Sequence, residues 1–279
     1  MAVANAMTPT RARRKVWPCV VAALLLSLGA GLMIVRKEAG GLRNVFSRAY
    51  WAERMSGDDL FSHKSHVFKR GNRDHREICL TIDDGPHPAS CAKILDILAQ
   101  HDIRVTFFLV GTRIKDHPEL VRRMLEEGHE VGNHTQDHLR LDSLPANQVH
   151  NEIVNCETNF HRATGQRMYL FRPPGMRFND EVIREALAQG YVTVSWDVGA
   201  KDFTAAHAKP EEIVIRVLKQ LDNGVIVLLH DTPETAEALP EILDGIENQG
   251  YRILTATEMM ERLPNPVRVP TNAFRVNTR

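Results

Sequence analysis

The sequence predicts an α/β fold built around a parallel sheet. From residue 77 onward, short apolar runs typical of buried strands alternate with segments that carry one apolar stripe at helical spacing. Strands joined through helices run parallel, and short continuous apolar strands indicate that both faces of the sheet are covered. A closed or nearly closed (β/α) barrel fits the number of strands. A doubly wound open sheet is the alternative, because periodicity does not distinguish the two.

Seven runs are predicted to be strands: residues 78–82, 105–109, 130–133, 169–172, 192–196, 225–229 and 251–254. Between them lie expected helices such as 118–127 and 240–249, where Met124 and Ile242 belong to the apolar stripes. Gly85 and Pro86 stop the first strand at once, so that two adjacent carboxylates remain at its carboxyl end.

Length and composition fit one large domain with an appendage. The chain has 279 residues, of which 43% are hydrophobic and 25% charged. Its formal net charge of zero gives no electrostatic argument for a nucleic-acid partner, so we discount that class. Apart from Cys19 in the N-terminal apolar segment, the cysteines are an odd three without Cys-x-x-Cys spacing, which favours isolated buried thiols.

The appendage lies at the N-terminus. Residues 17–35 form an uncharged apolar run that is just long enough to span a membrane as a helix, and the basic residues within 1–16 favour a cytoplasmic N-terminus. We therefore expect a membrane anchor, with a linker at 36–76, an extracytoplasmic main domain at 77–262 and a tail at 263–279. A cleaved signal peptide is the alternative and would make the protein secreted, although no clear Ala-x-Ala site precedes Arg36.

Two groups of polar residues follow the first and third strands. Asp83 and Asp84 end the first, and because neighbours on an extended chain point to opposite faces, we expect one metal ligand and one general base. Asp-Asp-Gly-Pro could equally be only a turn. His134 and His138 follow the third strand, and at this spacing a helical backbone would turn both imidazoles toward one ion. With Asp84 they would form a catalytic zinc site.

Three further strand ends carry polar residues. Arg172 with Pro173, Pro174 and Gly175 closes the fourth strand, Asp202 and Phe203 lie in the loop after the fifth, and His230 closes the sixth. Each feature alone is ordinary, since a loop arginine is usually solvated and a histidine after a strand usually lies on the rim. Five such features at the ends of five strands predict an active site, because loops converge at the carboxyl ends of parallel strands.

Together these residues resemble the five ordered motifs of the polysaccharide deacetylase family, carbohydrate esterase family four. The motifs are Thr81-Ile82-Asp83-Asp84-Gly85-Pro86, His134-x-x-x-His138, Arg172-Pro173-Pro174, Asp202 and Leu228-x-His230. The resemblance covers about residues 77–260. It implies a metal-dependent amide hydrolase on a distorted (β/α) barrel of about seven parallel strands, which removes N-acetyl groups from the amino sugars of a glycan.

The resemblance also implies a role for each residue. Asp84, His134 and His138 would hold Zn²⁺ or another divalent metal such as Co²⁺, Mn²⁺ or Ni²⁺. Asp83 would be the general base, oriented by Arg172, and His230 would be the general acid, held by Asp202. The implied substrate contacts are Pro174, Gly175, Phe203 and Leu228, of which Leu228 would line the acetyl methyl pocket.

The sequence departs from the family pattern in two substrate-facing loops. An aromatic residue and then Gly usually follow Arg-Pro-Pro, whereas this chain has Gly175 and Met176. Asp-x-x-Asp-Trp is replaced by a stretch that begins at Gly199 and ends at Phe203. Three functions therefore stay open: deacetylation of peptidoglycan or a chitin-like polymer, deformylation or deacetylation of a lipid-linked sugar or other small amide, and non-catalytic carbohydrate binding. The sequence leaves the oligomeric state undetermined.

Overall fold

The computed structural model describes residues 67–203, 209–267 and 269. Within these residues one sheet runs in the order β1-β6-β5-β4-β3-β2-β8-β7, with β9 paired to β2, and every pair is parallel. The strands are β1 (Val67–Phe68), β2 (Glu77–Gly85), β3 (Thr106–Leu109), β4 (Glu130–Asn133), β5 (Leu170–Phe171), β6 (Val192–Val194), β7 (Val198–Gly199), β8 (Ile226–His230) and β9 (Arg252–Leu254).

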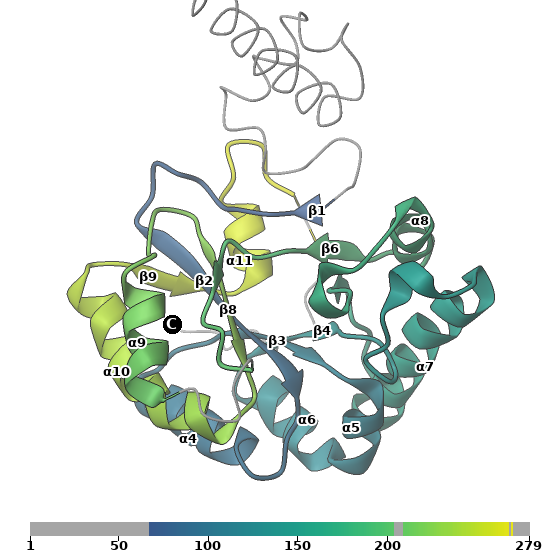
Figure 1. Cartoon of the computed structure of the whole chain (residues 1–279), viewed down its shortest axis with the longest axis horizontal. Helices are drawn as coiled ribbons and strands as arrows, with labels where there is room; N and C mark the ends of the chain where they lie inside the picture. Colours follow the sequence, from purple (N-terminus) through teal and green to yellow (C-terminus); the bar gives the residue numbers. More distant parts are fainter. Residues whose placement is uncertain (1–66, 204–208, 268, 270–279) are drawn as a thin grey trace, which may run out of the picture. The chain divides into compact units, whose positions relative to one another are not determined.

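Helices cover the outer side of the sheet (Figure 1). They are α4 (Cys91–Gln100), α5 (Gly111–Asp116), α6 (Pro118–Glu126), α7 (Ala146–Thr164), α8 (Asp180–Ala188), α9 (Pro210–Leu218) and α10 (Pro233–Asn248), with a further helix, α11 (Ala256–Glu261), that packs on the inner side. The sheet curls like part of a barrel, which supports the barrel over the doubly wound alternative, although β1, β7 and β9 each have only one partner among the described strands.

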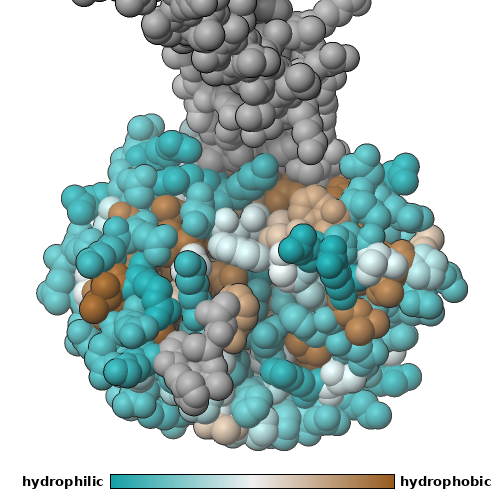
Figure 2. Space-filling model, viewed as in Figure 1, coloured by the Kyte–Doolittle hydropathy of each residue, from teal (hydrophilic) through white to brown (hydrophobic). Residues whose placement is uncertain are grey.

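Strand β2 pairs with more strands than any other described strand. Its neighbours are β3, β8 and β9. Ile78, Leu80 and Ile82 point into the outer core against the helices, whereas Cys79 belongs to the inner cluster. The two-residue alternation of a strand therefore turns Thr81 and Asp83 toward the inner face. Hydrophilic residues cover most of the surface in Figure 2, and the hydrophobic ones form small separate patches.

All seven predicted strands are present, and both faces of the sheet are covered as expected. The sequence analysis missed β1 and β7, because two residues cannot show a period. Strand β1 lies within 36–76, so the prediction of a linker is wrong for its last residues: Val67 and Phe68 are fully buried, and the Gly71 amide donates to Gly224. At the other end Leu263, placed in the predicted tail, is buried in the inner cluster.

One predicted helix began too late. The expected helix at 240–249 is the second half of α10, which begins at Pro233 and contains Pro240 in its interior. Thr232 caps this helix by accepting a hydrogen bond from the Thr235 amide, a start signal that the proline at 240 obscured. As predicted, Cys79, Cys91 and Cys156 are free and buried.

The predicted membrane anchor at 17–35 and the basic segment 1–16 lie outside the described residues. None of the helices that the structure does describe is long and apolar enough to cross a membrane. The anchor therefore stays a prediction from the sequence.

Candidate active site and metal centre

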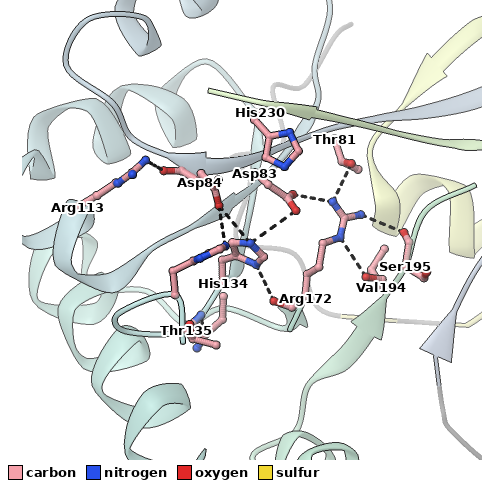
Figure 3. A network of polar contacts seen from close by, with 12 residues as sticks. Thr81, Asp83, Asp84, Arg113, His134, Thr135, Arg172, Val194, Ser195 and His230 are labelled. Atoms are coloured by element: carbon pink, nitrogen blue, oxygen red, sulfur yellow. Dashed lines mark hydrogen bonds and ion pairs between the residues drawn. The ribbon is translucent and has the colours of Figure 1, made fainter. Parts of the chain in front are cut away.

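Asp84, His134 and His138 meet at the carboxyl ends of β2 and β4, as the sequence predicts. Asp84 Oδ1 lies 3.4 Å from His134 Nε2 and 3.1 Å from His138 Nε2. One ligand atom from each of the three residues lies within 4.8 Å of the other two. Figure 3 shows the Asp84 carboxylate pointing at the His134 ring. These three residues could hold one metal ion.

The histidines converge through a loop and not through a helix, which corrects one step of the sequence argument. Thr135 and His138 both have positive φ angles, 70° and 56°, so the backbone that joins β4 to the second imidazole is not helical. Asn133 accepts a hydrogen bond from the Thr135 amide at 2.8 Å, and Glu152 accepts one from the Asp137 amide at 3.0 Å. Both acceptors are buried, so the loop is anchored to the interior of the domain.

The donor atoms fit a divalent metal ion. His134 Nδ1 lies 2.6 Å from the Arg172 carbonyl oxygen, which can only accept, so Nδ1 donates and Nε2 carries the lone pair. That lone pair faces Asp84 Oδ1, which is buried and has no hydrogen-bond partner among the described residues. Two acceptors that face each other are stabilised by a cation between them. Two imidazoles and one carboxylate are a donor set that Zn²⁺ accepts with a coordination position left open.

Asp83 and Asp84 reach the same site, contrary to the expectation that they point to opposite faces. Asp84 has a φ of 69°, and the pairing of β2 with β3 shifts register between Asp83 and Gly85. Both carboxylates therefore approach His134 Nε2, Asp83 at 3.7 Å and Asp84 at 3.4 Å. Their environments still differ, since the Asp83 side chain is 3% exposed and that of Asp84 27%.

Arg172 holds Asp83 from the inner side of the sheet. Its Nη1 donates to Asp83 Oδ1 at 2.6 Å and to Thr81 Oγ1 at 2.9 Å, and its other nitrogens donate to the carbonyl oxygens of Val194 and Ser195 (Figure 3). The guanidinium is fully buried and lies 4.1 Å from the centre of the Phe108 ring. A buried guanidinium whose three nitrogens are all hydrogen-bonded fixes the carboxylate that it pairs with.

His230 lies beside Asp83, because the two residues are in register on the neighbouring strands β2 and β8. Its Nδ1 lies 2.8 Å from Asp202 Oδ1, and its backbone amide donates to Asp202 Oδ2 at 2.6 Å. Thr235 donates a further hydrogen bond to Asp202 at 2.7 Å. Burial alone would lower the pKa of His230, but the hydrogen bond and negative charge of Asp202 outweigh it and raise the pKa above its ordinary value.

The expected substrate contacts surround this centre. Phe203 is 61% exposed, and its ring centre lies 4.7 Å from that of His230. Leu228 is buried beside Gly199 in the β7–β8 pair.

Pro174 begins a 3-10 turn, η3 (Pro174–Met176), in which Gly175 has a φ of 57°. A Cβ added at Gly175 would meet, among the described residues, only the Arg177 side chain at 3.7 Å, so the position expected to be aromatic is open.

The sequence analysis assigned no role to three residues of this region. Asp231, directly after His230, accepts hydrogen bonds from the Ser90 hydroxyl at 2.6 Å and the His87 amide at 2.8 Å. Trp196 lies 5.6 Å from the Arg172 guanidinium, and Arg113 donates to the Asp84 carbonyl oxygen. Only Asp231 could have been recognised from the sequence, because it is adjacent to His230. The contacts of Trp196 and Arg113 join residues that are distant in the sequence.

The parallel α/β fold and the five clustered motifs define a family, and comparisons with known proteins agree. Residues 70–194 match the family model described as polysaccharide deacetylase. A peptidoglycan-N-acetylglucosamine deacetylase of Bacillus cereus is 38% identical over 187 residues, which cover 66% of this chain and 87% of the relative. The peptidoglycan-N-acetylmuramic acid deacetylase PdaA of Bacillus subtilis is 34% identical over 200 residues, which cover 71% and 76%.

Solved structures show the same likeness. The Bc1960 peptidoglycan N-acetylglucosamine deacetylase superimposes with a TM-score of 0.68 at 29% identity, covering 72% of this chain and 95% of the other. A protein of Bacillus anthracis described as a CE4 family pseudoenzyme gives a TM-score of 0.67 at 28% identity, covering 74% and 72%. The chain belongs to the polysaccharide deacetylase family.

Proposed function

We propose that this protein is a divalent-metal-dependent hydrolase that removes N-acetyl groups from the amino sugars of peptidoglycan. The observation that carries the proposal is the placement of Asp83 and His230 beside the cluster of Asp84, His134 and His138. A site that only binds sugar needs neither a paired buried carboxylate nor an imidazole held by a second carboxylate. The names of the relatives, which are peptidoglycan deacetylases, support the substrate.

Each proposed role follows from the contacts. When bound, a divalent ion lowers the pKa of water toward about 7 and polarises an amide carbonyl. Arg172 occupies Asp83 Oδ1, so Oδ2 is the oxygen that can accept the proton of the attacking water. His230 donates through Nδ1 to Asp202, which leaves Nε2 to protonate the leaving amine. The Gly175 amide is the proposed donor to the developing oxyanion.

The chemistry predicts reversible loss of activity on chelation. The full-length protein should release acetate from peptidoglycan, lose at least about 100-fold of this rate after chelation, and recover it with Zn²⁺, Co²⁺ or Mn²⁺, because the ion supplies both the nucleophile and the electrophile. Acetate is measured enzymatically, with Asp83→Asn as the blank. Hydrolysis that persists in the chelator would contradict the metal assignment.

The same assay separates the two other functions. A non-catalytic glycan-binding domain, as the pseudoenzyme neighbour suggests, would bind peptidoglycan and release no acetate with any of these metals. A deformylase or deacetylase of a lipid-linked sugar would act on that substrate and not on the polymer. The open position at Gly175 favours this runner-up, because one sugar-contacting ring is missing there.

The Asp202–His230 contact predicts a shift in the pH profile. As general acid, His230 must be protonated, so activity is expected to fall as pH rises through its pKa, which Asp202 raises. In Asp202→Asn this negative charge is lost, and the alkaline limb of the kcat profile should move to lower pH by about 1 unit or more. Asp222→Asn, which removes an exposed carboxylate, is the control and should keep the wild-type profile. An unmoved limb in Asp202→Asn would remove His230 from the role of acid.

A further inference from the structure

Helix α5 touches both loops that carry the metal-binding residues. At its start, Val110 donates to the Gly85 carbonyl oxygen at 3.0 Å, just beyond Asp84. The next two amides, of Gly111 and Thr112, donate to the carbonyl oxygens of residues 135 and 136 at 2.9 and 3.0 Å, between the two histidines. The first amides of a helix have no partner within the helix, so these bonds join the two loops to one rigid element.

Arg113 adds a side-chain contact from the same helix to the aspartate itself. Its Nη1 donates to the backbone carbonyl oxygen of Asp84, and Figure 3 shows this contact, with the Asp84 carboxylate turned toward His134. The contact is partly buried, and a guanidinium bound to a carbonyl forms a charge-assisted hydrogen bond, which is stronger than one between neutral groups.

The backbone of Asp84 needs such support. Its φ of 69° lies in the left-handed region, which is unfavourable for a residue with a side chain. This conformation is what turns the carboxylate toward His134 and His138, because an extended residue here would face away from its neighbour Asp83. A contact that holds the carbonyl of Asp84 therefore also holds the direction of its carboxylate.

The charge of Arg113 and its contact with the Asp84 backbone predict opposite effects on metal binding. A positive group this close to a metal ligand repels a divalent cation, so on electrostatic grounds its removal would strengthen metal binding. Support of the Asp84 backbone predicts that its removal weakens metal binding. The two explanations thus differ in sign, which makes the role of Arg113 measurable.

We propose that Arg113 is a positioning residue, which sets the affinity of the site for divalent metal by holding Asp84 in its left-handed conformation. This inference rests on the proposed function, since it takes Asp84, His134 and His138 to be the ligands. Arg113 itself touches neither metal nor substrate. It acts through the backbone of one ligand, and α5 places it relative to the other two.

The test measures Zn²⁺ affinity of the full-length protein by competition with a chelating dye. Arg113→Met should bind Zn²⁺ about 10- to 100-fold more weakly than wild type, the usual effect of losing a group that orients a metal ligand. Arg113→Lys keeps a donor and the charge, and should recover most of the affinity. Lys115→Met removes one positive charge from the exposed face of the same helix and should leave the affinity unchanged. The visible spectrum of the Co²⁺-loaded protein should change only in Arg113→Met.

Several outcomes would overturn the inference. Tighter Zn²⁺ binding by Arg113→Met would show that repulsion dominates, and equal binding would show that Asp84 needs no support from this side chain. An equal loss in Lys115→Met would assign the effect to net charge. If Arg113→Met does not fold, as judged by its thermal unfolding without metal, Arg113→Lys decides, and a loss there as large as in an Asp84→Asn variant would overturn the inference. Failure of wild type to bind Zn²⁺ would overturn the proposed function as well.

Discussion

Replacing Asp83 by Asn is expected to leave the metal bound and to lower kcat by about 10²- to 10⁴-fold, the usual contribution of a positioned general base. Asn has nearly the same shape and can keep a contact with Arg172, but its amide cannot take up a proton. Metal content per mole of protein and kcat are measured together, and peptidoglycan is the substrate for both wild type and variant.

Asp84→Asn is the matched comparison, since it makes the same chemical change one residue along the chain. A neutral amide oxygen replaces an anionic ligand, so the two imidazoles should hold the metal less well, and activity should return in part at high metal concentration. An empty site in Asp83→Asn beside a full one in Asp84→Asn would show that the two roles are reversed. If both variants keep metal and activity, neither aspartate has the role proposed.

The left-handed conformation of Asp84 could not be predicted from the sequence. From Asp-Asp after an apolar strand, the prediction of two carboxylates at a strand end is correct, because burial and turn residues are local properties. Whether Asp83 and Asp84 face the same group depends on the φ angle of Asp84, which lies at the register shift between β2 and β3. An alternating strand pattern cannot contain that information.

For the histidine pair, the convergence was predicted correctly but the backbone conformation was not. His134 and His138 do converge with Asp84, although the helical backbone assumed for them is absent and Asn133 and Glu152 shape the loop instead. The spacing limited how far apart the rings could be, whichever conformation joined them.

The Asp202–His230 contact was reached only through the family resemblance, because the two residues are 28 positions apart and no local pattern joins them. Strands β1 and β7 were missed for a simpler reason, since a strand of two residues is indistinguishable from a loop in sequence.

The buried ion pair predicts the largest effect on stability. Arg172 is fully buried, and its guanidinium is the only arginine or lysine group within ion-pair distance of Asp83 among the described residues. Removal of one partner leaves the other as an uncompensated buried charge, so Arg172→Met is expected to lower the free energy of unfolding by about 3–5 kcal/mol. At roughly 2–4 °C per kcal/mol for a domain of this size, the midpoint of thermal unfolding should fall by about 6–20 °C.

A double-mutant cycle separates the ion pair from the rest of this network. In Arg172→Met with Asp83→Asn no buried charge remains at the pair, so the double variant should be more stable than Arg172→Met alone, while Asp83→Asn alone leaves the guanidinium bonded to Thr81, Val194 and Ser195. If Arg172→Met and the double variant are equally stable, the hydrogen bonds of Arg172 to carbonyl oxygens, and not its ion pair with Asp83, stabilise the inner side of the sheet. Activity would then be lost through displacement of β5, and the loss in Arg172→Met would exceed that in Asp83→Asn.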